Sequence, residues 1–289
     1  MSQIIPYNTF VNKALGGFLI GRNGTVEVQM ILTYLSNQRH NTTHQFYIER
    51  TGCFCKDDNP DMVRESIYSM CKQLILAINK CDVSVGPWYR PTLNAERELY
   101  NRHCSSNIQY IDLKDLEPYY APPDRRWTVH LKGLRIGIIS PFAETAFNQT
   151  KRRHLVWPKD TDTLLPDAKY IPIRTYFPPG VAGNRAGWPD DIHNWEHAIE
   201  YLERQCIGNI DIAIIGCGSI GMILGQRLKA WGIKCIVMGG ATQCLFGIKG
   251  RRWVSNPTIS RFWNDAWVSP SVDETPDGWE TIENGCYWY

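Results

Sequence analysis

The segment that most constrains the fold of this chain lies at residues 211–253 and reads DIAIIGCGSIGMILGQRLKAWGIKCIVMGGATQCLFGIKGRRW. Its pattern predicts a buried strand over 210–215, a helix over 220–231 and a second buried strand over 234–238. Gly216, Gly218 and Gly221 form a G-x-G-x-x-G turn between the first strand and the helix. Such a turn lets the backbone approach a phosphate and directs free helix N–H groups towards it. The segment therefore predicts a diphosphate site, and the alternative is the same unit with no ligand.

The residues after the second strand bear on which diphosphate ligand to expect. An NAD site carries an acidic residue there, about 20 positions after the turn, which binds the ribose hydroxyls. Here residues 237–241 read VMGGA, without a carboxylate. Arg251 and Arg252 lie too far along the chain to replace that residue in a simple NADP site. An NAD(P)-dependent oxidoreductase is therefore an alternative hypothesis and not the first one.

The composition argues against several other classes. Lys and Arg number 31 against 29 Asp and Glu, a net charge of +2, so we expect no broad basic face and no nucleic-acid partner. No stretch reaches the roughly 18 apolar residues of a membrane span, and the N-terminus does not read as a signal peptide. The ten cysteines are scattered and mostly lie in apolar runs, as is typical of reduced thiols. We expect a cytoplasmic protein, and its oligomeric state stays open.

Strand and helix patterns alternate along the rest of the chain. Besides the two strands above, short apolar runs predict strands at 16–22, 81–89, 107–111, 135–140 and 169–174. Helical patterns lie between most of them, including one over 61–78 and one that Asp190 or Asp191 is expected to cap. This alternation predicts a Rossmann-like α/β fold, a mostly parallel, doubly wound sheet with helices on both faces. We expect one domain over 1–289, with 254–289 as a C-terminal tail that wraps it.

Polar and aromatic residues follow the ends of the predicted strands. Arg22 and Glu27 come after the first strand, and ligands of open α/β sheets gather at the carboxyl ends of strands. Arg22 can neutralise a phosphate, and Glu27 can hold a metal or accept a proton. The alternative is that Glu27 is an ordinary first-turn carboxylate, which gains ~0.3–1 kcal/mol from the helix dipole. Trp88 and Tyr89 are equally compatible with a platform for a sugar or base and with a plug for the core.

Two segments together resemble the GT-D class of glycosyltransferases. They are FLIGRNGTVE at 18–27 and GCGSIGMILGQRLKAWGIKCIVMGG at 216–240. In that class an early R-x-G-D-x-E type motif serves the nucleotide-sugar site, and a late glycine turn, helix and strand complete a Rossmann-like fold. The chain further resembles bacterial and viral relatives of that class in LEPYY, LKGLRIGIISPFAETAFNQ, GGATQCLFGIKGRRW and ENGCYW. The resemblance spans residues 16 to the end.

The resemblance implies a glycosyltransferase of glycan biosynthesis, which moves a sugar from a UDP- or GDP-linked donor to a glycan acceptor. The glycine turn would hold the diphosphate, the segment 249–252 would close over it, and Thr242 and Gln243 would read the sugar or the nucleotide. Glu27 is the candidate base or metal ligand, with Asp82 and Glu144 in reserve. The residues expected at the donor are Arg22, Gly24, Gly216, Gly218, Ser219, Gly221, Gly239, Gly240, Thr242, Gln243, Lys249, Arg251 and Arg252.

The chain departs from the class at one position that matters for a metal. Thr25 stands where the class motif has its aspartate, so Glu27 is the remaining carboxylate. A lone carboxylate is a weak site for Mn²⁺ or Mg²⁺ unless other oxygens and the diphosphate complete it. Arginine side chains, including Arg22, can take over part of the charge neutralisation on a leaving diphosphate. The same departure keeps a third hypothesis open, a non-catalytic relative that binds a glycan or another partner.

Overall fold

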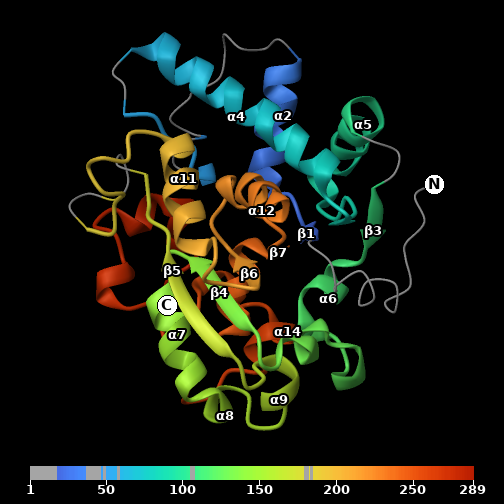
Figure 1. Cartoon of the computed structure of the whole chain (residues 1–289), viewed down its shortest axis with the longest axis vertical. Helices are drawn as coiled ribbons and strands as arrows, with labels where there is room; N and C mark the ends of the chain where they lie inside the picture. Colours follow the sequence, from blue (N-terminus) through green and yellow to red (C-terminus); the bar gives the residue numbers. More distant parts are fainter. Residues whose placement is uncertain are drawn as a thin grey trace.

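The computed structural model of the chain describes residues 18–36, 47, 50–56, 59–104, 108–178, 182 and 185–289. Seven strands form one sheet in the order β3-β2-β1-β7-β6-β4-β5, and every neighbouring pair is parallel (Figure 1). The expected parallel α/β sheet is therefore confirmed. The strands are β1 (Leu19–Gly21), β2 (Val83–Val85), β3 (Gln109–Ile111), β4 (Arg135–Ser140), β5 (Lys169–Arg174), β6 (Ile212–Ile215) and β7 (Lys234–Val237).

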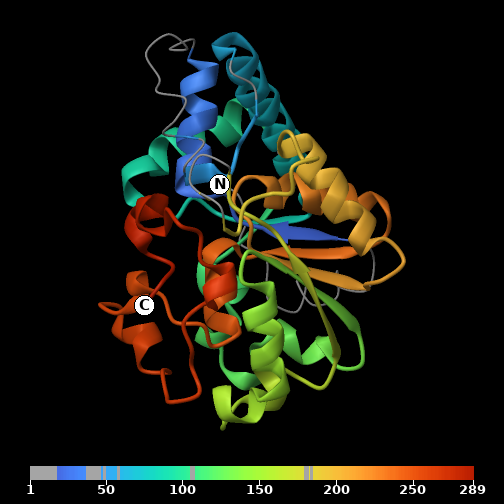
Figure 2. The same ribbon diagram turned by 90° about the vertical axis from the view of Figure 1, so that its left-hand side faces the viewer.

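Helices cover both faces of this sheet, as Figures 1 and 2 show. Successive side chains of a strand point to opposite faces, so Ile139 belongs to one apolar core and Ile138 to the other. One face carries α2 (Thr25–Leu35), α4 (Pro60–Lys80), α5 (Leu93–His103), α11 (Trp195–Cys206) and α12 (Ile220–Ala230). The other carries α6 (Leu113–Leu116), α7 (Ala143–Lys151), α8 (Arg153–Val156), α9 (Thr161–Leu164), α13 (Thr242–Leu245) and α14 (Pro257–Ser260).

The start of α11 differs from the sequence prediction. Neither Asp190 nor Asp191 caps this helix, because they form a turn in which Ile192 N–H donates to the Pro189 carbonyl at 3.0 Å. The chain then stays extended as far as Asn194, which pairs with Cys55 in an isolated bridge. The Asn194 side chain accepts the His197 N–H at 2.9 Å and is the true cap. The apolar stripe located the helix correctly, but several capping residues in a row left its first residue open.

The strand order places a topological switch point between β4 and β6. From β4 the chain leaves through α7 on one face and reaches β5 at the edge of the sheet. From its neighbour β6 the chain leaves through α12 on the other face and reaches β7, towards the middle. The two connections diverge, so they leave room at the carboxyl ends of these strands. Ligands of open α/β sheets bind at such a point.

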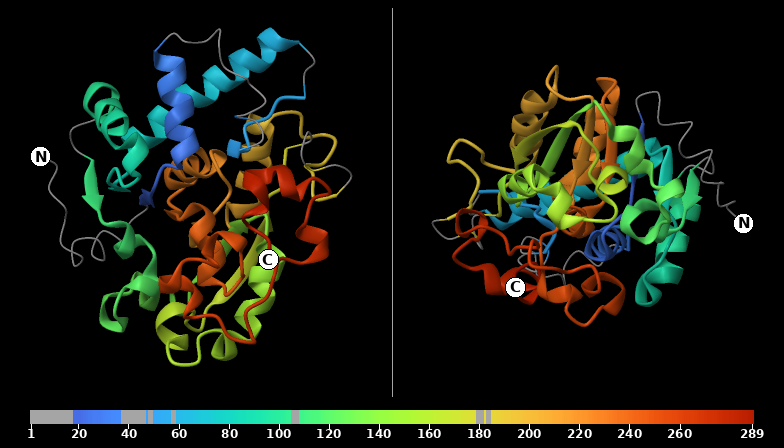
Figure 3. Two further views of the ribbon diagram at one scale, coloured as in Figure 1. Left: turned by 180° about the vertical axis from the view of Figure 1, so that it is seen from behind. Right: turned by 90° about the horizontal axis from the view of Figure 1, so that it is seen from below.

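Residues 254–289 form short helical turns and irregular chain that pack on the sheet domain (Figure 3). Trp288 is buried and its ring lies edge-on to Phe142, directly after β4, with centroids 5.7 Å apart. Ile282 is buried in the same core. The segment therefore contributes to the hydrophobic core and lies beside the carboxyl ends of the strands.

Two further findings concern the cysteines and the apolar length of the helices. All ten cysteines lie in the described ranges, and each is a free thiol. None of the helices that the structure describes combines the length and the apolar composition needed to cross a bilayer.

Candidate functional site

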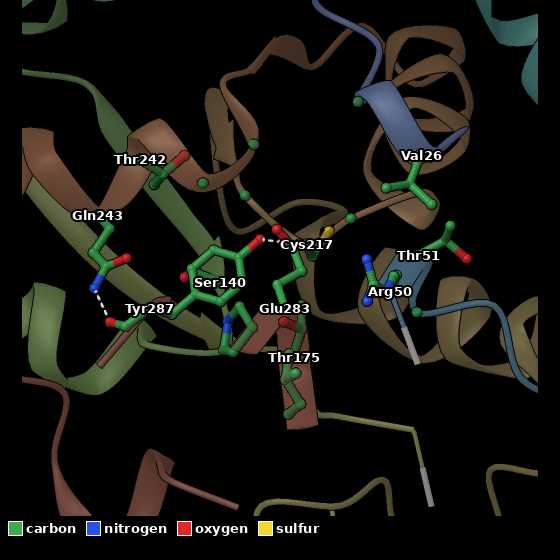
Figure 4. A pocket seen from close by; sticks show the side chains of 18 of the residues that line it. Val26, Arg50, Thr51, Ser140, Thr175, Cys217, Thr242, Gln243, Glu283 and Tyr287 are labelled. Carbon is green, nitrogen blue, oxygen red and sulfur yellow. Dashed lines mark hydrogen bonds between the residues drawn. The ribbon is translucent and has the colours of Figure 1, made fainter. Parts of the chain in front are cut away.

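A cavity of about 210 Å³ lies at the carboxyl ends of the central strands, where the connections after β4 and β6 diverge (Figure 4). Residues that follow β1, β4, β5, β6 and β7 line it, together with part of the C-terminal segment. The polar and charged residues of its wall are Arg22, Thr25, Glu27, Arg50, Thr51, Ser140, Thr175, Thr242, Gln243, Arg252 and Glu283. Trp88 and Tyr287 are among the aromatic residues of the wall.

The three glycines of the turn after β6 have different roles. A side chain on Gly216 would collide with the Gly239 carbonyl, so the first glycine lets this turn pack on the turn after β7. Gly218 has a positive φ of 62°, a conformation that favours glycine. Gly221 faces Ile215 and Val237 and brings α12 close to the sheet. Gly216 and Gly218 line the cavity, whereas Gly221 serves packing.

The first turn of α12 is partly occupied by another segment of the chain. The Thr51 carbonyl accepts the Ser219 N–H at 2.8 Å and the Ser219 hydroxyl at 2.7 Å, and it also covers the α-carbon of Gly218. Within the described ranges, the backbone N–H groups of Cys217 and Gly218 have no hydrogen-bond partner, and both residues line the cavity. An anion at this turn would therefore bind to those two groups. Ser219 is not available to it, because its N–H and hydroxyl both bind the loop at 50–52.

Glu27 lies in the first turn of α2, with its carboxylate folded back over Gly24. A side chain at position 24 would collide with the carboxylate in this position and would force the Glu27 side chain to move. Burial raises the pKa of Glu27 to about 7, and the nearby Glu283 carboxylate acts in the same direction. Arg22 and a backbone hydrogen bond act against the rise. A carboxyl group that titrates near neutral pH is suited to accept or release a proton in catalysis.

A network of buried polar side chains holds the loop between β1 and α2 in position. The Asn23 side chain donates to the Tyr100 hydroxyl at 2.6 Å, and this hydroxyl donates to Glu96 at 3.3 Å. All three residues are buried, and burial raises the pKa of Glu96 to about 7. Since Asn23 lies between Arg22 and Gly24, the network helps to position the loop that carries both the arginine and Glu27.

Two arginines lie against the glycines that follow β7. The Arg22 guanidinium packs over Gly239, and its Nη1 donates to buried Glu117 at 2.9 Å. The Arg252 guanidinium packs over Gly240 in the same way. A dinucleotide-binding site has its ribose-binding carboxylate at this turn. Here two guanidinium groups lie at the turn instead, Arg22 paired with Glu117 and Arg252 paired with Glu283.

The C-terminal segment supplies a second carboxylate and a phenol. Glu283 accepts a hydrogen bond from Arg252 at 2.6 Å through one oxygen. Its other oxygen accepts a hydrogen bond from the Tyr287 hydroxyl at 2.7 Å (Figure 4). Glu283 and Asn284 have positive φ values of 47° and 56° and are followed by Gly285 at 66°. Non-glycine residues rarely adopt this conformation, and such strain is often found at functional sites. The tight bend turns Glu283 towards the cavity.

The structure brings ten of the residues predicted from the sequence together in the cavity wall. They are Arg22, Gly24, Glu27, Gly216, Gly218, Gly239, Gly240, Thr242, Gln243 and Arg252. Ser219 and Gly221 lie directly behind the glycine turn, in the roles described above.

Four other predicted residues lie outside the wall. Lys249 lies 5.8 Å from the ring centres of both Trp263 and Tyr289, and Arg251 is exposed. Asp82 precedes β2, at the opposite end of the sheet, where it accepts the Leu19 N–H at 2.8 Å and pairs with Lys229 at 2.7 Å. Glu144 has an exposed side chain on α7. We therefore propose neither Asp82 nor Glu144 as a catalytic group.

Sequence reasoning overlooked several residues of the wall. Ser140 ends β4 and Thr175 directly follows β5, so the rule that ligands gather at carboxyl ends could have found both. Glu283 and Tyr287 follow no strand, and only their place in the ENGCYW motif distinguished them. Thr51 and Arg50 carried no recognisable signal.

The donor groups of the wall do not fit a resident divalent cation. In the part of the chain that the structure describes, no group of three or more His, Cys, Asp or Glu side chains could hold a metal ion. Glu27 and Glu283 are the two carboxylates of the wall, and Glu283 is already bound by Arg252 and Tyr287. We therefore assign no chemical step to a metal.

Comparisons of the chain with models of known protein families, with curated proteins and with solved structures found no match.

Proposed function

We propose that the chain is a glycosyltransferase that uses a nucleotide-diphosphate sugar. The observation that carries the proposal is the meeting of three groups in one cavity at the switch point. They are a glycine turn with two unpartnered N–H groups in the described structure, two arginines, and a carboxyl group with a pKa of about 7. A diphosphate needs the first two, and activation of an acceptor hydroxyl needs the third.

In the proposed reaction, the oxygen of an acceptor hydroxyl attacks the anomeric carbon of the donor sugar. The bond from that carbon to the β-phosphate oxygen breaks, and the nucleoside diphosphate leaves with the bonding electron pair. Deprotonated Glu27 takes the proton of the acceptor hydroxyl. The negative charge that develops on the leaving group is stabilised by Arg22, Arg252 and the N–H groups of the glycine turn.

The arginines at the turn after β7 make the oxidoreductase hypothesis weaker than this one. That turn carries no carboxylate for a nicotinamide ribose, and Gly239 and Gly240 seat guanidinium groups there. A non-catalytic glycan-binding protein would have the same cavity but would not depend on the ionisation of Glu27. The test below separates the three hypotheses.

The decisive experiment is titration calorimetry with UDP-, GDP- and dTDP-sugars and with NADH and NADPH, followed by measurement of nucleoside diphosphate release. We expect a nucleotide sugar to bind and the release rate to rise with pH through about 7, because the base is the deprotonated form. Glu27→Gln should retain affinity within about threefold and lose about 10²–10⁴-fold in turnover. Glu144→Gln, outside the cavity, is the matched control and should behave as wild type.

Four results would count against the proposal in different ways. Absence of heat with every nucleotide sugar would refute it, and heat with NADH or NADPH alone would favour an oxidoreductase. Binding of a nucleotide sugar with turnover unaffected by Glu27→Gln would remove Glu27 from the mechanism. Binding of a glycan without any release of nucleotide would indicate the non-catalytic alternative.

A further inference from the structure

Two oxygen atoms in the cavity wall are buried without a hydrogen-bond partner. Six buried side-chain nitrogen or oxygen atoms of the described residues lack a partner, and only two of them belong to residues of the wall. These two are Thr175 Oγ1 and Gln243 Oε1, which are also the only oxygens of the six. Thr175 is 1% exposed and Gln243 is 3% exposed. Buried polar atoms without a partner are rare in native proteins, so each requires an explanation.

The orientation of the Gln243 amide is fixed by the backbone around it. Its Nε2 donates to the Tyr287 carbonyl at 2.6 Å and to the Lys249 carbonyl at 2.9 Å, and the first of these bonds is drawn in Figure 4. The reverse orientation would place an oxygen against two carbonyl oxygens. Oε1 therefore remains an acceptor, and in Figure 4 it points towards the middle of the pocket. An amide oxygen cannot pair with an ionised phosphate, so its partner must be a neutral group or cation that donates.

Thr175 offers the complementary chemistry next to the end of β4. Its backbone N–H donates to the Ser140 carbonyl at 3.1 Å, which fixes the residue just beyond β5. Its hydroxyl can donate or accept. Thr175 and Gln243 lie on either side of Tyr287 in Figure 4, and the Tyr287 ring contacts Phe142, which follows β4. Arg22 lies at Gly239, and the Arg252 guanidinium lies at Gly240, 4.2 Å from the centre of the Tyr287 ring.

We infer that Thr175 and Gln243, on either side of Tyr287, form a subsite for hydroxyl groups of the ligand. A hydroxyl is the group that can both donate to Gln243 and pair with Thr175 in either direction. The inference rests on the proposed function and deepens it, since it names groups for the hydroxyls of a nucleotide sugar in addition to those for its diphosphate. The hydroxyls can come from the transferred sugar or from the ribose.

Thr175→Val tests this subsite because valine has the same shape and lacks the hydroxyl. The hydroxyl has no partner among the residues that the structure describes, so its removal should leave the melting temperature unchanged or higher. The affinity for the nucleotide sugar that binds wild type should fall about three- to tenfold, the range of one neutral hydrogen bond. Thr150→Val is the matched control, because Thr150 Oγ1 donates to the Phe147 carbonyl at 2.7 Å and the residue lies outside the wall. It should lower the melting temperature and leave affinity unchanged.

The ligands used as probes are UDP, UDP-glucose, GDP, GDP-mannose and forms of them that lack single hydroxyls. A loss on Thr175→Val confined to nucleotide sugars assigns the subsite to the sugar, and an equal loss with the nucleotides alone assigns it to the ribose. The matching deoxy ligand should bind wild type more weakly and show no further loss with the variant. Unchanged affinity of Thr175→Val, or of wild type for every deoxy form, overturns the subsite alone. Failure of wild type to bind these probes and dTDP-sugars overturns the proposed function together with it.

Discussion

At the scale of single residues, two carboxyl groups in the described part of the chain are shifted by burial to a pKa of about 7. Glu27 lies in the cavity wall. Glu96 lies outside the wall, where it accepts a hydrogen bond from Tyr100. Both groups are neutral in the folded protein at mildly acidic pH. Because their pKa values lie above the ordinary value of 4.5, the folded state binds more protons than the unfolded state between about pH 4.5 and 7.

This difference in bound protons predicts that stability falls with rising pH. The contribution of each group is fully present below about pH 4.5 and is lost as the pH rises through about 7. Glu96→Gln replaces the buried acid by a neutral group of the same shape. The free energy of unfolding of this variant, relative to wild type, should therefore increase between pH 5 and pH 8, by at most about 3 kcal/mol.

Urea unfolding at the two pH values measures this difference, and the contribution of Glu27 cancels because both proteins contain it. Glu98→Gln, on the exposed face of the same helix, is the control and should show a much smaller dependence on pH. If the Glu96→Gln difference stayed constant between pH 5 and pH 8, then Glu96 would not be the group that titrates.

At the scale of elements, the unit β6–α12–β7 holds two glycines with positive φ that make a matched pair. Gly218 at 62° lies under the Thr51 carbonyl, whereas Gly232 at 76° has open space around its α-carbon. Gly232→Ala should cost about 1–2 kcal/mol, the penalty of a left-handed alanine. Gly218→Ala should cost more, since its methyl group would also push the loop at 50–52 away from Ser219.

Thermal unfolding of both variants, with nucleotide-sugar affinity as a second readout, checks this prediction. Gly232 does not line the cavity, so its substitution should leave affinity unchanged. Gly218→Ala should weaken binding as well as stability. Equal losses of stability in the two variants would show that the contact with Thr51 does not contribute.

The helices and strands also show which parts of the fold could be predicted from the sequence. Local periodicity located β4 and β5 at their observed bounds and α12 to within one residue, because each pattern depends on neighbours along the chain. The cap of α11 was wrong by several residues, since Asp190, Asp191 and Asn194 all have capping side chains. The site followed the same division. Wall residues that follow β1, β6 and β7 were found, but Ser140 and Thr175, at the ends of β4 and β5, were overlooked. Glu283 and Tyr287 come from irregular chain whose position depends on distant contacts.

The basic segment after α13 is a further example of this limit. Lys249, Arg251 and Arg252 were expected to act together on a diphosphate, but only Arg252 reaches the cavity. Residues 251–253 form a helical turn, η7 (Arg251–Trp253), so neighbouring side chains point in different directions. The composition of the segment showed that it is positively charged. Which of its side chains point into the cavity could be seen only in the three-dimensional structure.

At the scale of the whole molecule, one sheet joins the early and late parts of the chain. β1 pairs with β2 on one side and with β7 on the other, and β7 in turn pairs with β6. The group β1–β3 and the group β4–β7 meet at the β1–β7 pair, so neither group can keep this pairing if the other unfolds. The sheet is therefore consistent with the single domain expected from the sequence.

We accordingly expect one cooperative unfolding transition. Urea transitions followed by far-ultraviolet circular dichroism and by tryptophan fluorescence should coincide, and calorimetric and van't Hoff enthalpies should agree. Tryptophan residues occur both before and after β4, so fluorescence reports on both parts. Two separated transitions would show that the halves unfold independently in spite of the β1–β7 pairing.

The position of β7 has a consequence for how the protein is made. Ile20 of β1 pairs with Ile236 of β7, more than two hundred residues further along the chain. During synthesis on the ribosome, the first three strands therefore emerge long before the strand that will cover the edge of β1. An open strand edge readily pairs with other chains, so the nascent protein carries a temporary aggregation hazard. Slow translation between β3 and β7 would prolong this exposure, and a chaperone that shields strand edges would shorten it.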